Sequence, residues 1–146
     1  PPQKPSSAAS DVYKRQAWRY GQKEEVIYVG DSDLHGQGVF SNEDICTGQS
    51  IELCPYLVAD EHDFAESCIL HDYVFEHPED KTAFLVVLGW GMVYNHSNNP
   101  NAEWEVYMDD PNFIRFFALR DIPKGTEITH DYGGQYWSSR EEEADN

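Results

Sequence analysis

The most restrictive feature of the sequence is a short polar segment that directly follows an apolar run. Residues 84–94 are mainly apolar, and residues 95–101, NHSNNPN, then bring together one histidine, one serine and four asparagines. Buried polar side chains need hydrogen-bond partners, so these groups cannot all lie in a core. The segment, called the polar bend below, is therefore either a surface turn or a binding site built where a buried element stops.

Most of the other signals along the chain predict β-strands. Runs of β-branched and aromatic residues, or clean alternation of apolar and polar residues, predict strands at residues 26–29, 38–40, 82–88, 102–108 and 113–119. Residues 60–70 predict one short helix, with Phe64, Cys68 and His71 on one side. The chain is thus expected to be mainly β, with several small, short-stranded sheets and few short helices.

One eight-residue pattern occurs twice. Residues 44–51 and 121–128 both read D-I-x-x-G-x-x-I. In the second copy, Pro123 fits position i+1 of a type I turn and Gly125 fits position i+3. The pattern therefore predicts the same strand-turn-strand device at two places, although eight residues are too few for a solenoid repeat.

Length and charge limit the classes of protein to which the chain can belong. Its 146 residues suggest one domain. Residues 1–16 resemble a translated sequencing adaptor, so we expect a non-native, disordered segment there, a domain at residues 17–140 and an acidic tail at residues 141–146. The formal charge is −17, from 27 acidic and 10 basic residues. Such a charge disfavours nucleic acid as a partner and attracts cationic partners.

Neither a membrane segment nor a metal site is expected. No apolar run approaches the roughly 20 residues that span a bilayer, and no signal-peptide pattern opens the chain, so we expect an intracellular protein that is neither secreted nor membrane-bound. The three cysteines are Cys46, Cys54 and Cys68. Cys68 and His71 form a C-x-x-H pair, but no second pair follows, so reduced thiols are the better interpretation.

Three segments contain the candidate chemistry, and each has an ordinary interpretation when taken alone. Gly36, Gln37 and Gly38 allow the backbone to approach a ligand closely, but a lone G-x-G predicts a hairpin turn. The polar bend could be an Asx-rich surface turn with a structural histidine. Residues 126–137 lead through Tyr132 and two glycines to further aromatic residues, which is also typical of a strand end with aromatic packing.

Taken together and in this order, the three segments resemble the SET domain, a family of protein-lysine methyltransferases that use S-adenosylmethionine. The motifs are G-x-G-V-F, N-H-S-x-x-P-N and G-x-E-I-T-x-D-Y-G, and the resemblance covers about residues 26–140. Within the family, the pattern is most similar to the small free-standing SET protein of a chlorella virus. The resemblance implies a SET fold with a C-terminal pseudoknot, in which the polar bend and the D-Y segment lie side by side.

The resemblance also implies roles for individual residues. Tyr132 would supply the catalytic hydroxyl group. The cofactor, S-adenosyl-L-methionine, would contact Gly36, Gln37, Gly38, Asn95, His96 and Trp137. The walls of the substrate channel would come from Tyr28, Tyr73, His130 and Tyr136. The remaining residues of the polar bend would hold the loop, namely Asn98, Asn99, Pro100 and Asn101.

The sequence departs from the family pattern at three positions. No cysteine follows Cys68, so we expect no counterpart of the zinc-binding cysteine cluster that follows the SET domain in many members. His130 stands two residues before Tyr132, where the family often has Phe or Tyr and where the residue influences how many methyl groups are added. Gln37 stands where the viral protein has an aromatic residue.

The resemblance implies an S-adenosylmethionine-dependent protein-lysine N-methyltransferase that acts on a basic, histone-like protein tail. Two alternatives remain open: a catalytically silent SET-like module and an acidic histone-binding protein. The viral resemblance also suggests a homodimer, in which Val87, Leu88 and Trp90 would form an apolar patch unless they are simply part of the core.

Overall fold

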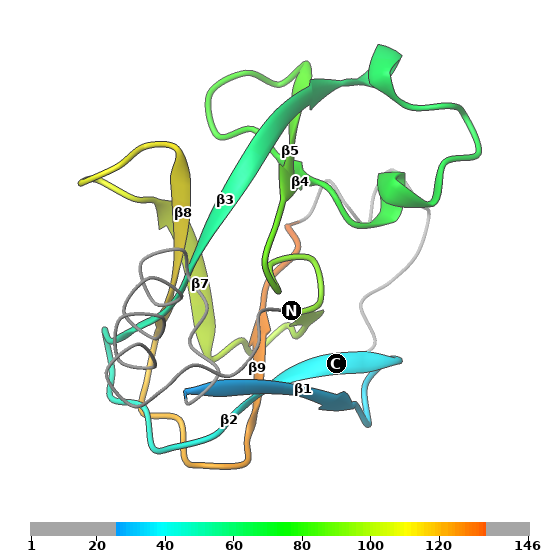
Figure 1. Cartoon of the computed structure of the whole chain (residues 1–146). Coiled ribbons are helices and arrows are strands. Elements are labelled where there is room, and N and C mark those ends of the chain that lie inside the picture. The colour runs from blue at the N-terminus through cyan, green and yellow to red at the C-terminus, as the bar shows by residue number, and fades with distance from the viewer. Residues whose placement is uncertain (1–25, 134–146) are drawn as a thin grey trace, which may run out of the picture.

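The computed structural model describes residues 26–133 (Figure 1). This part of the chain forms nine strands and two 3-10 turns. In chain order they are β1 (Ile27–Asp31), β2 (Gln37–Ser41), β3 (Ser50–Asp60), η1 (Glu61–Asp63), η2 (Ile69–Asp72), β4 (Phe75–Glu76), β5 (Ala83–Val87), β6 (Asn95–His96), β7 (Ala102–Val106), β8 (Phe113–Ala118) and β9 (Glu127–His130). The mainly β fold and all five expected strands are confirmed, with ends that differ by one or two residues.

The strands form two sheets. One has the order β1-β2-β9-β6, and the other has the order β4-β5-β3-β8-β7. The long strand β3 pairs with β8 along its first half and with β5 along its second half, so one strand connects the two ends of its sheet (Figure 1). Every pairing is antiparallel except that of β6 with β9, which is parallel.

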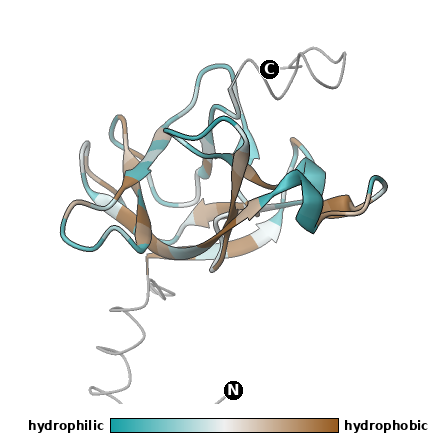
Figure 2. Cartoon of the chain, turned by 90° about the horizontal axis from the view of Figure 1, so that it is seen from above, coloured by the Kyte–Doolittle hydropathy of each residue, from teal (hydrophilic) through white to brown (hydrophobic). Residues whose placement is uncertain are grey.

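The core lies between the strands. Ile114, Phe116 and Ala118 are buried and alternate with half-buried neighbours along β8, as the two-residue period of a strand requires. Ile51 of β3 and Ile128 of β9 are fully enclosed in the same cluster. Figure 2 shows the result: apolar strands gather at the centre, and hydrophilic loops surround them.

The prediction of a helix at residues 60–70 is wrong. Only the 3-10 turns η1 and η2 form there, and neither contains a buried residue. The Asp60 carboxylate accepts a hydrogen bond from the His62 N–H, and the Asp63 carboxylate accepts one from the Asp60 N–H, which closes η1 after three residues. Because a short helix in water depends on an apolar face packed against the core, this segment cannot continue as one. No helix in the described part of the chain is long and apolar enough to cross a membrane.

The two D-I-x-x-G-x-x-I copies lie against each other as a symmetric pair. Ile45 and Ile122 form an antiparallel bridge between the copies. The Asp44 carboxylate accepts a hydrogen bond from the Lys124 N–H at 2.9 Å. The Asp121 carboxylate accepts one from the Thr47 N–H at 2.8 Å. The first residue of each copy therefore satisfies the backbone of the fourth residue of the other copy.

The expected type I turn at Pro123 is wrong, because Pro123 and Gly125 each occupy a position one earlier in the turn than expected. The Thr126 N–H donates to the Pro123 carbonyl, so Pro123 is the first residue of the turn and not the second. Gly125 then occupies position i+2 with φ +85°, and Gly48 has φ +81° in the first copy. A positive φ at i+2 is the mark of a type II turn, which favours glycine there.

The three apolar residues considered for a dimer interface differ in exposure. Val87 belongs to the core, whereas Leu88 and Trp90 are 40% and 41% exposed. An apolar patch would therefore depend on Leu88 and Trp90, and the homodimer stays a prediction. The predicted adaptor-like segment and acidic tail, together with Tyr136 and Trp137, lie outside the described residues.

Candidate functional site

The parallel pairing of β6 with β9 brings the polar bend beside the D-Y segment. Asn95 pairs with Thr129, and His96 pairs with His130. The Ser97 N–H continues this ladder by donating to the His130 carbonyl at 3.1 Å. The two segments that the family resemblance places side by side are therefore direct neighbours, although more than thirty residues separate them in the sequence.

The side chain of Asn95 ties the polar bend to the glycine loop at residues 35–38. Its Nδ2 donates to the main-chain oxygens of His35 and Gln37, at 2.9 and 3.0 Å. It also donates to the Glu127 carboxylate at 2.8 Å. Three protein acceptors therefore share the amide hydrogens, and the carbonyl oxygen of the side chain is the atom through which Asn95 can bind a ligand.

Glu127 is a central residue of the site that sequence reasoning did not single out. Its second carboxylate oxygen accepts a hydrogen bond from the Ser32 hydroxyl at 2.7 Å, so Glu127 joins β9 to the polar bend and to the connection between β1 and β2. A Cβ atom on Gly38 would lie 2.3 Å from this carboxylate, so only glycine fits there. The available signal was the Glu of the G-x-E-I-T motif, a charged residue at the start of a buried strand.

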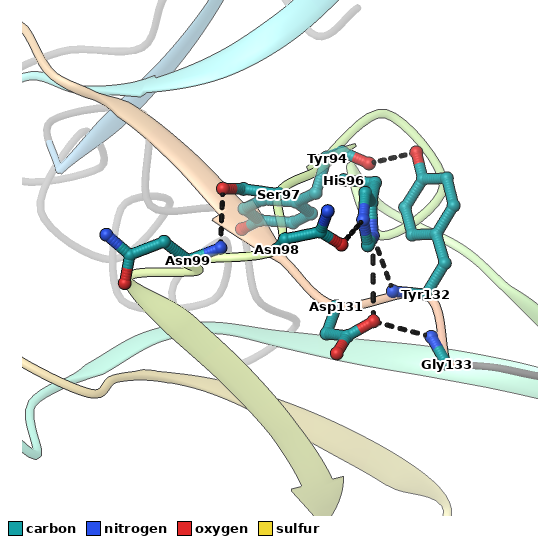
Figure 3. A network of polar contacts seen from close by, with 8 residues as sticks. All are labelled: Tyr94, His96, Ser97, Asn98, Asn99, Asp131, Tyr132 and Gly133. Carbon is teal, nitrogen blue, oxygen red and sulfur yellow. Dashed lines mark hydrogen bonds and ion pairs between the residues drawn. The ribbon is translucent and has the colours of Figure 1, made fainter. Parts of the chain in front are cut away.

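His96 holds the D-Y segment against the polar bend (Figure 3). Its Nδ1 accepts a hydrogen bond from the Tyr132 N–H at 3.0 Å, and its Nε2 lies 2.9 Å from the Asn98 side-chain oxygen. These partners fix the neutral tautomer with its proton on Nε2, because Nδ1 must present a lone pair to an N–H donor. The Asp131 carboxylate lies 3.6 Å from the same Nδ1.

Tyr132 is fixed at both its backbone and its hydroxyl group. The hydroxyl donates to the Tyr94 main-chain oxygen at 2.9 Å (Figure 3). Its ring lies 5.2 Å from the ring of His96 and 5.0 Å from the ring of His130, measured between centroids. Because the hydroxyl hydrogen is directed at Tyr94, the phenolic oxygen acts as an acceptor towards other groups.

The rest of the polar bend is held by hydrogen bonds within the protein, as expected. The Asn101 side chain donates to the Glu127 carbonyl and accepts from the Thr129 N–H, so it extends the pairing with β9. The Arg120 guanidinium binds the Asn99 and Pro100 main-chain oxygens at 2.7 and 2.8 Å. These internal hydrogen bonds fix the shape of the bend.

His130 is a buried histidine without polar partners in the described structure. It is 3% exposed, and neither ring nitrogen has a hydrogen-bond partner there. Burial lowers its pKa to about 4, with a smaller contribution from His96. The ring lies 5.3 Å from Phe75 and 5.6 Å from Phe116. A neutral imidazole therefore forms part of an otherwise aromatic wall at neutral pH.

A cavity of about 770 Å³ opens beside Tyr132. Its lining includes the aromatic residues Tyr73, Phe75 and Trp104 together with His130 and Tyr132. Three carboxylates also face it, from Asp72, Glu76 and Asp131. The cavity thus combines an aromatic wall with negative charge, which suits an alkyl chain that ends in a cation.

The structure brings some of the predicted site residues together and leaves others apart. Tyr73, His130 and Tyr132 line the cavity, and Asn95 contacts the glycine loop directly. Tyr28 does not line the cavity; it stacks on Phe40 at 5.4 Å between ring centroids.

Comparison with known proteins decides the family. The SET domain pattern matches residues 36–133. The chain belongs to the SET domain family. A crystal structure of a candidate histone methyltransferase from Plasmodium falciparum matches the SET domain described above with a TM-score of 0.60 and 36% identity, over 76% of this chain and 96% of that one.

Curated relatives of this SET domain are named as histone-lysine N-methyltransferases. A Schizosaccharomyces pombe enzyme, specific for histone H3 lysine 37, is 29% identical over 76% of this chain and 76% of its own length. A candidate enzyme from Arabidopsis thaliana is 29% identical over 66% of this chain, which spans 30% of that protein. The more specific resemblance to the chlorella-virus protein stays a prediction.

The described part of the SET domain contains no group of three metal-ligating side chains. Cys46 is exposed, Cys54 is buried and Cys68 is half-buried, and all three are free thiols. His71, the partner considered for Cys68, has its ring against that of Phe64, at 5.2 Å between centroids.

Proposed function

We propose that the protein is an S-adenosylmethionine-dependent protein-lysine N-methyltransferase. The observation that carries the proposal is the Tyr132 hydroxyl, which is fixed by the Tyr94 carbonyl at the wall of an aromatic cavity, one strand away from Asn95 and the glycine loop. The family and the names of the relatives support the same reaction.

The glycine loop and the polar bend fit a cationic methyl donor. Gly36 has φ +48°, and a Cβ added there would meet nothing within 4 Å, so bare backbone faces open space. Glu127 adds a carboxylate beside this loop. Gly36, Gln37, Gly38, Asn95 and His96 would hold S-adenosylmethionine, with Trp137 as a further contact, and the cofactor supplies a methyl group on a positively charged sulfur.

The cavity would prepare the lysine amine for attack. A free lysine has a pKa of about 10.4 and must lose its proton to act as a nucleophile. The aromatic wall removes water from the ammonium group, which lowers the lysine pKa. His130 remains neutral, so it adds no positive charge to the aromatic wall. Tyr73 and Tyr136 are the proposed remaining walls of the channel.

Tyr132 would orient the amine. Its phenolic oxygen accepts a hydrogen bond from the nitrogen, and it can also accept weak C–H···O contacts from a polarised methyl group. Most of the acceleration would come from the alignment of donor and acceptor, because correct orientation removes a large entropic barrier. No carboxylate base is required for this scheme.

The substrate would be a lysine-rich, histone-like tail. The carboxylates of Asp72, Glu76 and Asp131 around the cavity and the net charge of −17 favour a basic segment. Action on histones would place the protein inside the cell, where its substrate lies.

Substitution of Tyr132 tests the proposal. Tyr132→Phe keeps the ring but removes the hydroxyl, so kcat is expected to fall about 100-fold or more while the melting temperature stays close to that of wild type. The measurement is transfer of labelled methyl groups to core histones, with mass spectrometry to identify the modified lysines.

Tyr107→Phe is the matched control, because Tyr107 also carries a hydrogen-bonded hydroxyl, to Asp109 on the surface, and should retain full activity. Full activity of Tyr132→Phe would refute the role given to Tyr132. Absence of cofactor binding in calorimetry would favour a silent SET-like module, and salt-sensitive histone binding that ignores the cofactor would favour an acidic histone-binding protein.

A further inference from the structure

Glu52 is a carboxylic acid in the middle of the core. It lies on β3 and is 1% exposed. Its Oε1 accepts a hydrogen bond from the Tyr94 hydroxyl at 2.8 Å, and its Oε2 accepts one from the Trp90 N–H at 3.0 Å. Burial of a carboxyl group is costly unless its oxygens are satisfied, and here two donors satisfy them.

The two oxygens of Glu52 hold both ends of the segment that leads into the polar bend. Trp90 begins this segment, and Tyr94 is its last residue before Asn95. Gly89 precedes it with φ +65°, and a Cβ there would lie 2.7 Å from the Glu52 Oε2. The chain therefore passes directly over the carboxyl group, in contact with it.

Tyr94 connects Glu52 to Tyr132. The Tyr94 ring is buried and stacks on Phe116, with centroids 4.2 Å apart, while its hydroxyl points to Glu52. Its main-chain oxygen accepts the hydroxyl hydrogen of Tyr132. A change in the hydrogen bond between Glu52 and Tyr94 therefore acts on the residue that fixes the Tyr132 hydroxyl.

We propose that Glu52 is a positioning residue for methyl transfer, which acts through Tyr94 on the orientation of the Tyr132 hydroxyl. The inference rests on the function proposed above, because it assumes that Tyr132 contacts the reacting groups.

The ionisation state of Glu52 decides how it holds Tyr94. As a carboxylate it accepts from both donors, whereas the acid carries one O–H hydrogen, and a proton on Oε1 would turn the Tyr94 hydroxyl from a donor into an acceptor. Burial raises the pKa of Glu52 to about 7, against the lowering effect of its hydrogen bonds. The titratable groups that face it are the Cys54 thiol on β3 and the Tyr94 hydroxyl, and burial raises the pKa of both further above neutrality.

Glu52→Gln tests the proposal, because glutamine has the same shape and cannot ionise. The wild type is expected to show a step in kcat near pH 7 in addition to the rise caused by lysine deprotonation. The variant should lack this step, with kcat lowered about tenfold at pH 8 and with KM for cofactor and peptide within about threefold of wild type. Glu43→Gln, at an exposed position after β2, is the matched control.

Two further measurements separate this proposal from a purely structural role and from the proposed function. Tyr94→Phe removes the same hydrogen bond, so the effects of Glu52→Gln and Tyr94→Phe on kcat should not add. In protein labelled with ¹³C-tyrosine, the ring carbon that bears the Tyr94 hydroxyl should titrate near pH 7 in wild type and not in Glu52→Gln.

Three results would overturn the proposal: equal pH profiles of wild type and Glu52→Gln, additive effects on kcat, or a Tyr94 signal that does not change with pH. A wild-type protein that transfers no methyl group would refute the proposed function instead, and the spectroscopic titration would still decide whether Glu52 controls Tyr94.

Discussion

At the scale of single residues, the site depends on polar groups that the core surrounds. The ring nitrogens of His130 have no hydrogen-bond partner within residues 26–133, and the ring lies against the rings of Phe75, Phe116 and Tyr132. Burial makes a charged imidazole in this position costly, and the neighbouring Asp131 offsets only part of that cost. The folded protein therefore keeps His130 neutral, and unfolding allows it to take up a proton.

This burial predicts how stability depends on pH. The pKa of His130 is about 4 in the folded protein and about 6.5 when unfolded, so its contribution to stability is present above pH 6.5 and is lost as pH falls to 4. The loss should be on the order of 3 kcal/mol in the free energy of unfolding. His130→Phe should lack it.

Urea unfolding at several pH values between about 4 and 7 measures this difference. Glu52 has the opposite effect, because its raised folded pKa makes the protein lose stability as pH rises from about 4.5 to 7. Wild type and His130→Phe both contain Glu52, so its contribution cancels when their stabilities are compared. His62→Phe, at an exposed position, is the control. Parallel pH curves for wild type and His130→Phe would contradict the burial argument.

The sequence identifies the candidate site residues more readily than the residues that hold them in place. Tyr132 and Asn95 stand in motifs with a specific order and spacing. Glu52 is one charged residue inside a strand, and Glu127 is one glutamate in a motif. Glu52 and Glu127 are important because they bind Trp90 and Asn95, which lie 38 and 32 residues away in the sequence. A local sequence pattern cannot reveal contacts between such distant residues.

At the scale of elements, the paired D-I-x-x-G-x-x-I copies form an internal support that joins distant parts of the chain. Each turn depends on a glycine with positive φ, at Gly48 and Gly125. A Cβ at either position would meet nothing within 4 Å, so the cost of a side chain there is conformational and not steric. The cost of the same substitution can therefore be compared at two equivalent positions, Gly48 and Gly125.

Gly48→Ala and Gly125→Ala are expected to destabilise the protein equally. An L-residue in the left-handed region costs about 1–2 kcal/mol, and a Cβ meets no neighbour within 4 Å at either turn. Denaturant unfolding measures both values. Gly30→Ala in β1 is the matched control, because its φ is not positive and its nearest contact would lie at an ordinary 3.6 Å. Costs that differ by more than about 1 kcal/mol would show that the copies are not equivalent.

Prediction from sequence succeeds for strands defined by their own side chains and fails for those defined by their partners. The alternation in residues 102–106 and 113–118 is visible without a structure. The two-residue strands β4 and β6 have no such pattern, because only the neighbouring strand makes them strands. The contact of β6 with β9 is expected from the family resemblance and not from any local signal, and its parallel direction comes from the structure.

At the scale of the whole molecule, the acidic surface and the carboxylates at the cavity act on the same kind of partner. The chain has 17 more acidic than basic residues, and among the described residues Asp72, Glu76 and Asp131 line the cavity with one lysine, Lys81. Such a field attracts a basic peptide over distances of about 10 Å at 0.1 M salt, and it weakens as salt screens it.

Salt should therefore affect capture of the substrate more than the reaction itself. Between about 50 mM and about 500 mM salt, KM for a lysine-rich peptide is expected to rise roughly tenfold, with kcat nearly unchanged. Steady-state kinetics measures both constants. A peptide with the same target lysine and uncharged flanks is the control, and its KM should be nearly constant. Equal salt dependence for the two peptides would exclude a steering role for the surface charge.

The parallel pairing of β6 with β9 also has a consequence for synthesis of the protein. A nascent chain leaves the ribosome with the glycine loop and the polar bend complete, while the partner of Asn95 and the tyrosine beside His96 have yet to be translated. On the proposed function, a chain that stops before residue 127 lacks β9 and Tyr132, so it is expected to transfer no methyl group however well the sheet β4-β5-β3-β8-β7 folds.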